Sequence, residues 1–479
     1  MVQFGIMKLG RLFNQIIKIG FYGLFFLTPI VFNPSRTSPS SELFELIKML
    51  FVYAILVIIV TSWIGKMIVA RKLIFKRTPF DIPLWLFLIS QVISAYFSID
   101  RHVSIFGYYS RFHGGLLSTF SYILLYHALV SNLDVVNLTK LLLVSIYSGV
   151  IVAGYGIMEK FGIDAHMWVQ DVRSRVFSTL GQPNWLAAYL TILLPISISF
   201  SLINLCKSDL NNRKTQNYNL KLKNFLLVAC HLSLVTLFYV CLLFTKSRSG
   251  FLAFWTTNVF FWIFTYFILN KYRKLVIRLS LFFNFSFLIL NFLIRTPFVS
   301  YNKIASLDVI RPTNIEQIQL PPVNDTVINV GITDSSVIRR IVWQGAVEIT
   351  RHYPVFGTGP ETFAYAYYRF RPPAHNLTSE WDFLYNRSHN EFLNFAATSG
   401  LFGLICYLAI ILATVVFTIK NVLVNKKKVT LDTRLLLLAL LASYFNILIT
   451  NFFGFSVVIV GVFFFLIPAT PIITVLCPE

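Results

Sequence analysis

Long apolar runs, separated by short polar segments, fill most of this chain. A helix needs about 20 mostly apolar residues to cross a lipid bilayer, and about twelve runs approach that length. They span residues 12–32, 43–65, 81–97, 114–130, 138–158, 184–204, 224–244, 250–269, 274–294, 390–419, 433–451 and 453–475. Backbone groups in lipid must hydrogen-bond within their own segment, so these runs are expected to be helices. The predicted fold class is an all-α polytopic membrane protein with about 12 transmembrane helices.

One long polar interval, residues 295–388, interrupts this pattern. It divides the chain into three predicted parts. Residues 1–294 are expected to form a transmembrane bundle of about nine helices, and residues 389–479 a bundle of about three. Residues 295–388 are expected to form one large loop on one side of the membrane.

The second half of this loop contains a helical pattern. Asp334-Ser335-Ser336 offers N-cap residues, and the stretch stops near Tyr353-Pro354. Apolar residues recur between them at helical spacing, at Val337, Ile341, Val342, Ala346 and Ile349. The loop is therefore predicted to contain an amphipathic helix of about seventeen residues that lies along the membrane face.

Composition and charge support a membrane protein. Hydrophobic residues make up 56% of the 479 residues and charged residues 13%. The net charge of +21 raises the question of nucleic acid, but basic residues cluster between apolar runs, for example at 71–77 and 426–428. Such clusters mark the cytoplasmic side of a membrane and contact anionic lipid. We predict cytoplasmic termini, an extracytoplasmic (periplasmic) loop, contact with membrane lipid and no nucleic-acid partner.

Arginines at the outer boundary are candidates for binding phosphate. Arg248, in Ser247-Arg248-Ser249-Gly250, lies between two apolar runs with almost no loop. The planar guanidinium donates two parallel hydrogen bonds that match a phosphate. Arg339 and Arg340 offer a second such group. The alternatives are a snorkelling arginine at a helix end for Arg248, and a solvated or lipid-facing helix surface for Arg339 and Arg340.

His389 lies where the loop re-enters the membrane. A neutral imidazole accepts a proton from a hydroxyl near neutral pH, so His389 is a candidate general base. Its alternative is a capping or interfacial histidine. Asn390 either orients His389 or begins the next helix.

Other outer loops offer candidate binding residues. Arg175 and Asn184, the latter in Gly181-Gln182-Pro183-Asn184-Trp185, are predicted to line the same cavity, and Arg111 is a weaker candidate. Gly357-Thr358-Gly359 marks a tight turn. No Asp-x-Asp pair occurs on an outer loop, which disfavours a metal-dependent transferase. We expect neither a metal site nor a cofactor.

Several of these motifs together resemble the O-antigen ligase and polymerase superfamily. The likeness covers most of the chain and is densest from about residue 170 to 405. Its segments are Gly181–Ala187, Ser247–Gly250, Arg339–Trp343, Phe356–Gly359, Ser388–Leu393 and Ser399–Gly403.

The resemblance implies a GT-C-like glycosyltransferase of the bacterial inner membrane that acts in lipopolysaccharide or other polysaccharide biosynthesis. The donor would be a glycan on undecaprenyl diphosphate, used at the outer leaflet. The acceptor would be a hydroxyl on lipid A core, on another glycan repeat or on a protein.

The resemblance also implies roles for single residues. Arg248 and either Arg339 or Arg340 would bind the diphosphate in place of a divalent ion, and His389 would be the base. Substrate contacts are expected from Arg111, Arg175, Asn184, Trp343, Gly357, Gly359 and Asn390. The sequence departs from the family at Thr398-Ser399, where an acidic residue often precedes the glycine.

Three alternatives remain open on the sequence alone. The acceptor could be protein, which would make the chain a protein O-oligosaccharyltransferase. A lipid-linked glycan transporter would instead be expected to show paired halves with broken helices and polar residues near mid-membrane. A non-catalytic assembly component would tolerate the loss of His389 and Arg248.

Overall fold

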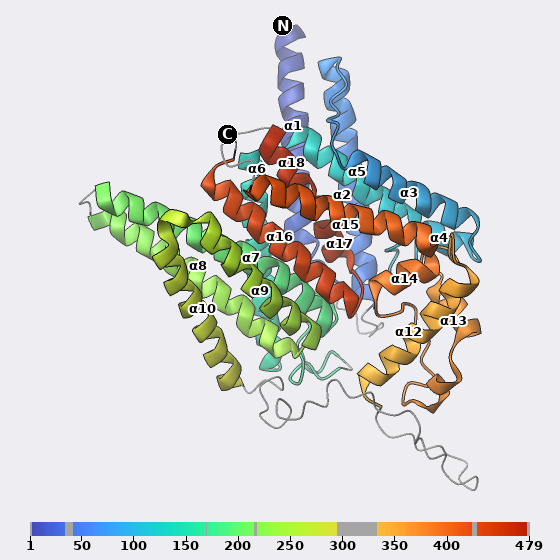
Figure 1. Cartoon of the computed structure of the whole chain (residues 1–479). Helices are drawn as coiled ribbons and strands as arrows, with labels where there is room; N and C mark the ends of the chain where they lie inside the picture. Colours follow the sequence, from blue (N-terminus) through green and yellow to red (C-terminus); the bar gives the residue numbers. More distant parts are fainter. Residues whose placement is uncertain are drawn as a thin grey trace.

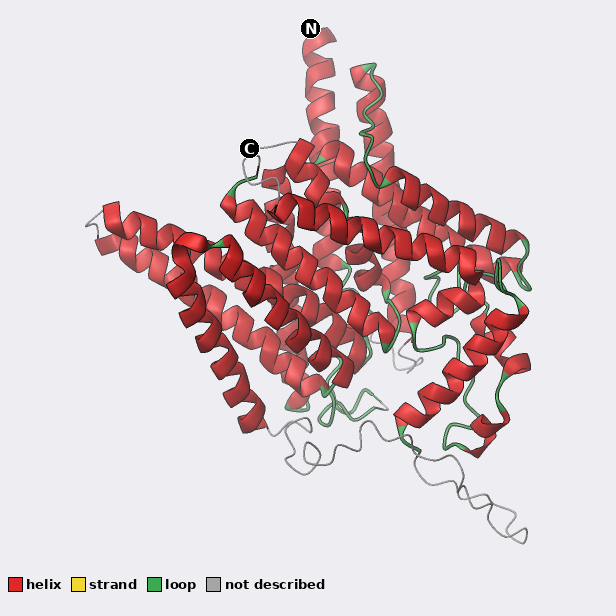
Figure 2. Cartoon of the chain, viewed as in Figure 1, coloured by secondary structure: helices red, strands yellow, loops and turns green. Residues whose placement is uncertain are grey.

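The computed structural model describes residues 2–33, 42–168, 170–214, 218–294, 333–423 and 429–476. Within these ranges the chain is helical, and no strand occurs (Figure 2). The first part of the predicted loop, residues 295–332, and the basic cluster at 426–428 lie outside the described residues.

The helices follow the order of the predicted apolar runs. They are α1 (Val2–Leu27), α2 (Glu42–Ala70), α3 (Asp81–Tyr96), α4 (Arg101–Phe106), α5 (Leu116–Asn132), α6 (Val135–Lys160), α7 (Pro183–Lys214), α8 (Tyr218–Thr245), α9 (Arg248–Ile268), α10 (Arg273–Ile294), α12 (Ser335–His352), α13 (Phe363–Phe370), α14 (Glu391–Thr398), α15 (Gly400–Leu423), α16 (Leu431–Phe452), α17 (Val458–Leu466) and α18 (Ala469–Leu476).

Eight membrane spans occur in the described ranges, judged by length and apolar composition. They lie in α2, α6, α7, α9, α10, α15, α16 and the α17–α18 pair. This confirms a polytopic helical membrane protein. The other four predicted runs fall in α1, α3, α5 and α8, which do not meet both criteria, so twelve spans remain a prediction.

The two most enclosed spans form the centre of the bundle. The apolar windows of α7 and of the α17–α18 pair are each 94% buried, whereas that of α10 is 17% buried. Helix α16 packs against both α7 and α9. The two chain ends lie at one end of the molecule, and α12 and α13 lie toward the opposite end (Figure 1).

The loop helix predicted after Asp334 is confirmed as α12. The Asp334 side chain accepts a hydrogen bond of 2.7 Å from the Ser336 amide and caps the helix, which runs for 18 residues. Its buried positions are Ile338, Val342, Gly345, Ala346 and Ile349. They pack on α13, α14 and the rings of Tyr367 and Tyr385 as a separate small core. Protein therefore covers the apolar face of α12, and the position of the helix along the membrane face stays a prediction.

The run at 390–419, predicted as one helix, is divided into α14 and α15 at Ser399-Gly400. The backbone of residues 354–359 enters the division. The amides of Thr358 and Gly359 donate to the last carbonyls of α14, at 3.2 and 2.8 Å, and the Leu401 amide donates to Pro354 at 2.8 Å. These bonds satisfy helix-end groups that would otherwise lack partners in an apolar surrounding. The division therefore anchors the loop domain to the bundle.

Two glycines make this close backbone contact possible. Gly400 has φ +69° and Gly357 has φ +70°, both in the left-handed region. A Cβ at Gly357 would lie closer than 3.0 Å to the backbone of Thr398. Backbone atoms cannot rotate away as a side chain does, so the contact excludes any larger residue.

We expect Gly357→Ala to destabilise the protein by more than about 2 kcal/mol, because overpacking and left-handed strain add together. Thermal unfolding in detergent measures the effect. Gly23→Ala is the matched control, since a Cβ at Gly23 meets nothing within 4 Å. Equal melting temperatures for the two variants would contradict this account of the helix division.

Candidate functional site

His389 lies in a pocket at the ends of several helices. The pocket encloses about 380 Å³ between the start of α7, the start of α9, the end of α16 and the irregular segment after it. Its lining residues are Gln182, Asn184, Trp185, Ala188, Ser249, His389, Thr450, Phe453, Gly454, Phe455 and Val457. The structure thus brings together two candidates more than 200 residues apart, Asn184 and His389.

The His389 ring is held between two aromatic rings. Its centroid lies 5.4 Å from that of Tyr385 and 5.5 Å from that of Phe455. The residue has φ +54°, a conformation that costs free energy for a non-glycine residue and that concentrates at functional sites. The ring nitrogens hydrogen-bond to no residue in the described ranges. They are therefore available to a ligand in the pocket.

The surroundings of His389 keep its imidazole neutral. Burial, followed by the positive charges of Arg339, Arg111 and Arg387, lowers its pKa to about 3. A buried cation beside other cations is unfavourable, so the ring does not hold a second proton at neutral pH. A neutral imidazole has a lone pair that can accept a proton from a hydroxyl.

A network of polar contacts joins Arg175 to the start of α9. Arg175 Nε donates to the Thr245 carbonyl at 3.0 Å, and its Nη2 donates to Asn184 Oδ1 at 3.4 Å. The same Asn184 oxygen accepts from Ser247 Oγ at 2.8 Å. Ser247 in turn caps α9 through the Gly250 amide. Arg248 therefore begins a helix of 21 residues whose N-terminal dipole favours an anion.

Three arginines act on one another electrostatically near this pocket, although none of them is among its lining residues. Burial lowers the pKa of Arg175, and the charges of Arg339 and Arg248 lower it further. Burial and the charge of Arg248 likewise lower the pKa of Arg339, while Tyr385, Glu380 and Asp334 act in the opposite direction. In the part of the chain that the structure describes, none of the three arginines forms an ion pair. We call Arg175, Arg248 and Arg339 the open arginine cluster.

The doubled arginine of α12 divides between two faces of the helix. Arg339 is half-buried and electrostatically coupled to Arg175 and Arg248, whereas Arg340 is exposed. Since adjacent residues on a helix point about 100° apart, only one of them can face the pocket. The charge of Arg339 acts on His389 and Arg175, which marks it as the arginine on the pocket side of α12.

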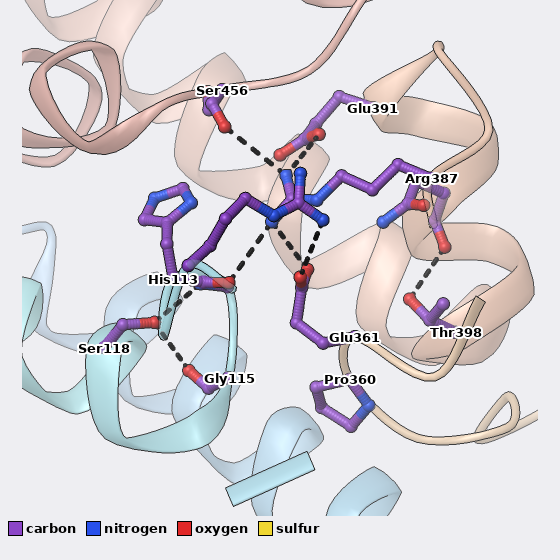
Figure 3. Close-up of polar contacts among 12 residues, drawn as sticks. His113, Gly115, Ser118, Pro360, Glu361, Arg387, Glu391, Thr398 and Ser456 are labelled. Carbon is purple, nitrogen blue, oxygen red and sulfur yellow. Dashed lines mark hydrogen bonds and ion pairs between the residues drawn. The ribbon is translucent and has the colours of Figure 1, made fainter. Parts of the chain in front are cut away.

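A second pair of arginines, Arg111 and Arg387, is more deeply buried and forms ion pairs with a glutamate. Arg387 Nη2 donates to Glu361 Oε1 at 2.6 Å, and Arg111 Nη2 lies 3.6 Å from Glu361 Oε2 (Figure 3). The side chains of the three residues are only 2–3% exposed. Arg111, predicted from sequence to bind substrate, is therefore placed in an internal ion pair. Glu361 and Arg387 were not predicted.

Glu391 completes the acidic side of this cluster. Its Oε2 lies 3.6 Å from Arg387 Nη1, and burial raises its pKa to about 7 (Figure 3). Both guanidinium groups also lie over the ring of Phe455, Arg111 at 5.3 Å and Arg387 at 5.0 Å. Arg387 and Glu391 carry opposite charges four residues apart, one on each side of His389. This spacing was a signal in the sequence for their pairing.

The remaining predicted residues have mainly structural contacts. Asn390 caps α14, its side chain accepting from the Leu393 amide at 3.1 Å. Gly357 and Gly359 are buried against α14 and against Ser98, away from the residues that line the pocket. Trp343 is half-buried on α12 and packs edge-on against Phe452 at 5.8 Å. Whether any of them contacts a substrate stays a prediction.

The described residues contain no group of three or more His, Cys, Asp or Glu side chains placed to hold a metal ion. No curated protein sequence matches the chain. The family model of O-antigen ligase matches residues 232–408, from within α8 to the first part of α15. This segment carries Arg248, Arg339 and His389. The match over residues 232–408 supports the likeness of the chain to the O-antigen ligase/polymerase superfamily that its sequence motifs indicate.

Proposed function

We propose that the protein is a membrane glycosyltransferase that moves a glycan from undecaprenyl diphosphate to an acceptor hydroxyl. The family match suggests glycan transfer in O-antigen biosynthesis. The observation that carries the proposal is the open arginine cluster near the pocket that the neutral His389 lines, with Arg339 acting electrostatically on both His389 and Arg175. An anion-binding group and a base within one site are what transfer from a diphosphate requires.

The open arginine cluster binds the diphosphate of the donor. Three cations without paired carboxylates attract a group with several negative charges, and the α9 N-terminus adds to the attraction. The same cations repel a divalent metal ion from this position. Negative charge grows on the diphosphate oxygens as the sugar leaves, so arginines already in place stabilise the transition state.

His389 activates the acceptor. The acceptor O–H gives its proton to a ring nitrogen of His389 while its oxygen forms a bond to the anomeric carbon. The bond from that carbon to the diphosphate oxygen breaks, and the diphosphate keeps the electron pair. Polyprenyl diphosphate is the leaving group, and His389 later releases the proton to solvent.

The proposal also fixes an orientation in the inner membrane. Both chain ends lie opposite the α12–α13 domain (Figure 1). The basic segment Arg71–Arg77 follows α2 and favours a cytoplasmic position for that end. The pocket then opens to the outer leaflet, with residues 333–388 as the described part of an extracytoplasmic domain between the bundles of residues 1–294 and 389–479.

Kinetics with a purified, lipid-linked glycan donor and a panel of acceptors test the roles of these residues. Arg248→Ala and Arg339→Ala are expected to weaken donor binding about 10- to 100-fold, the scale of a lost charge-assisted hydrogen bond. Arg340→Ala is the matched control and should bind like the wild type, because Arg248 and Arg339, but not Arg340, are the charges that act on Arg175. The acceptor that is used identifies ligase, polymerase or protein-directed activity.

His389→Gln is expected to lower kcat about 10²- to 10⁴-fold with donor affinity nearly unchanged, because it removes the base and keeps the diphosphate site. Full activity of this variant would refute the base assignment. If the lipid carrier moves between leaflets and no glycan is transferred to any acceptor, the protein is a transporter and the proposed enzyme function is refuted.

Transfer is expected to persist in EDTA, since the arginines supply the positive charge that a divalent ion would supply. The rate with EDTA is compared with the rate in added Mg²⁺. A loss of activity in EDTA that Mg²⁺ restores would contradict this account of the open arginine cluster.

Donor binding is expected to raise the pKa of His389. The free site holds it near 3 through burial and the charges of Arg339, Arg111 and Arg387. A bound diphosphate offsets positive charge, so the pKa should move toward the ordinary histidine value of about 6.5. Histidine NMR titration with and without inorganic diphosphate measures this shift, and a pKa that falls or stays fixed would contradict the proposed binding position.

A further inference from the structure

Three distant segments meet at one buried carboxylate. Glu361 precedes α13, Arg111 lies between α4 and α5, and Arg387 lies two residues before His389. Glu361 uses one oxygen for each arginine, at 2.6 Å to Arg387 and 3.6 Å to Arg111. Its backbone has φ +62°, which a non-glycine residue keeps only where surrounding contacts hold it.

Arg387 is fixed by further contacts besides Glu361. Its guanidinium donates to the carbonyls of His113 and Ser456, both at 3.3 Å, and lies beside Glu391 (Figure 3). On the other side of His389, Asn390 is fixed as the cap of α14. The strained backbone at His389 is thus held at both ends, so the position of the imidazole depends on the position of Arg387.

The same contacts keep this cluster away from a ligand. The side chains of Arg111, Glu361 and Arg387 are 2–3% exposed, and none of the three lines the pocket of His389. Phe455 contacts both the buried cluster and the pocket, since its ring lies against the two guanidinium groups and also against the ring of His389. The arginines therefore act on the pocket through Phe455 and through the backbone.

We propose that Arg111, Glu361 and Arg387 form a buried positioning triad that holds the His389 imidazole in its reactive place without touching the donor. The inference rests on the proposed function, because it states which residues hold the proposed base, His389, in position. It also explains Gly114, where a Cβ would lie closer than 3.0 Å to Glu361 Oε1 and Arg387 Nη2. The triad leaves no room there for a side chain.

Three variants test the triad by different routes. Arg387→Met removes one charge, and Glu361→Leu with Arg387→Met removes an ion pair and leaves apolar side chains. Arg387→Met alone is expected to be the more stable, because it leaves Glu361 paired with Arg111, whereas the double change leaves Arg111 as a buried charge without this carboxylate. Gly114→Ala displaces the triad with every charge kept, and Gly154→Ala is its control, since a Cβ at Gly154 meets nothing within 4 Å.

All three variants are expected to lower kcat about 100-fold, the scale of a base misplaced by about 1 Å. Donor affinity should change less than about threefold, because the open arginine cluster is intact. A wild-type kcat in the more stable Arg387→Met variant would overturn the inference and leave the triad as a fold element. A loss of donor affinity that accounts for the whole rate effect would overturn it too.

Histidine NMR separates this inference from the proposed function. In protein labelled at histidine Cε1, His389→Gln identifies the His389 signal among the eight histidines. One narrow His389 signal is expected in the wild type and in Gly154→Ala, and a broadened or divided signal in Arg387→Met and Gly114→Ala. An unchanged signal in both variants would refute the triad. Absence of transfer by the wild type would refute the proposed function, and the NMR result would still decide on the triad.

Discussion

Every interruption of a helix inside an apolar bundle leaves backbone amides and carbonyls that need hydrogen-bond partners, and the site is built where such interruptions meet. The break before α9 is satisfied by Arg175 and the Ser247 cap, at the Thr245 carbonyl and the Gly250 amide. The break before α17 is satisfied by Glu45, which accepts from the Val458 amide at 2.6 Å. Burying these polar side chains would cost free energy elsewhere in the bundle, but here they supply the missing hydrogen bonds. Several other polar side chains, including Asn184 and His389, line the pocket.

Two sets of arginines show how neighbouring groups decide the role of one residue type. Arg111 and Arg387 are buried with Glu361 and Glu391, so they form ion pairs within the protein that hold distant segments of the chain together. The open arginine cluster lies near the pocket without an ion pair among the described residues. Arg175 and Arg339 are half-buried, and such a cation gains free energy from an anion, so the open cluster has affinity left for a ligand and the enclosed pair does not.

Local patterns in the sequence were sufficient for the parts of the structure that depend on neighbours in the chain. Apolar runs predicted the membrane-spanning helices, and Asp334 with its following serines predicted the start of α12 to within three residues. The division at Gly400 was missed, because the run stays apolar across it and the inserted backbone comes from residues 354–359. Glu361 was missed for the same reason. Its two partners lie 250 residues before it and 26 after it, and no pattern in the sequence pairs them.

The electrostatics of the site favour an order of binding. In the free protein the positive surroundings that attract a diphosphate also make His389 a weak base, with a pKa of about 3. Proton transfer is most efficient when the pKa of the base lies near the working pH. A bound diphosphate cancels part of the positive potential, so the donor strengthens the base that acts on the acceptor. A hydroxyl that enters before the donor, including that of water, therefore meets a poor base. The same arginines that bind the leaving group would in this way restrict deprotonation to the complex in which transfer can follow.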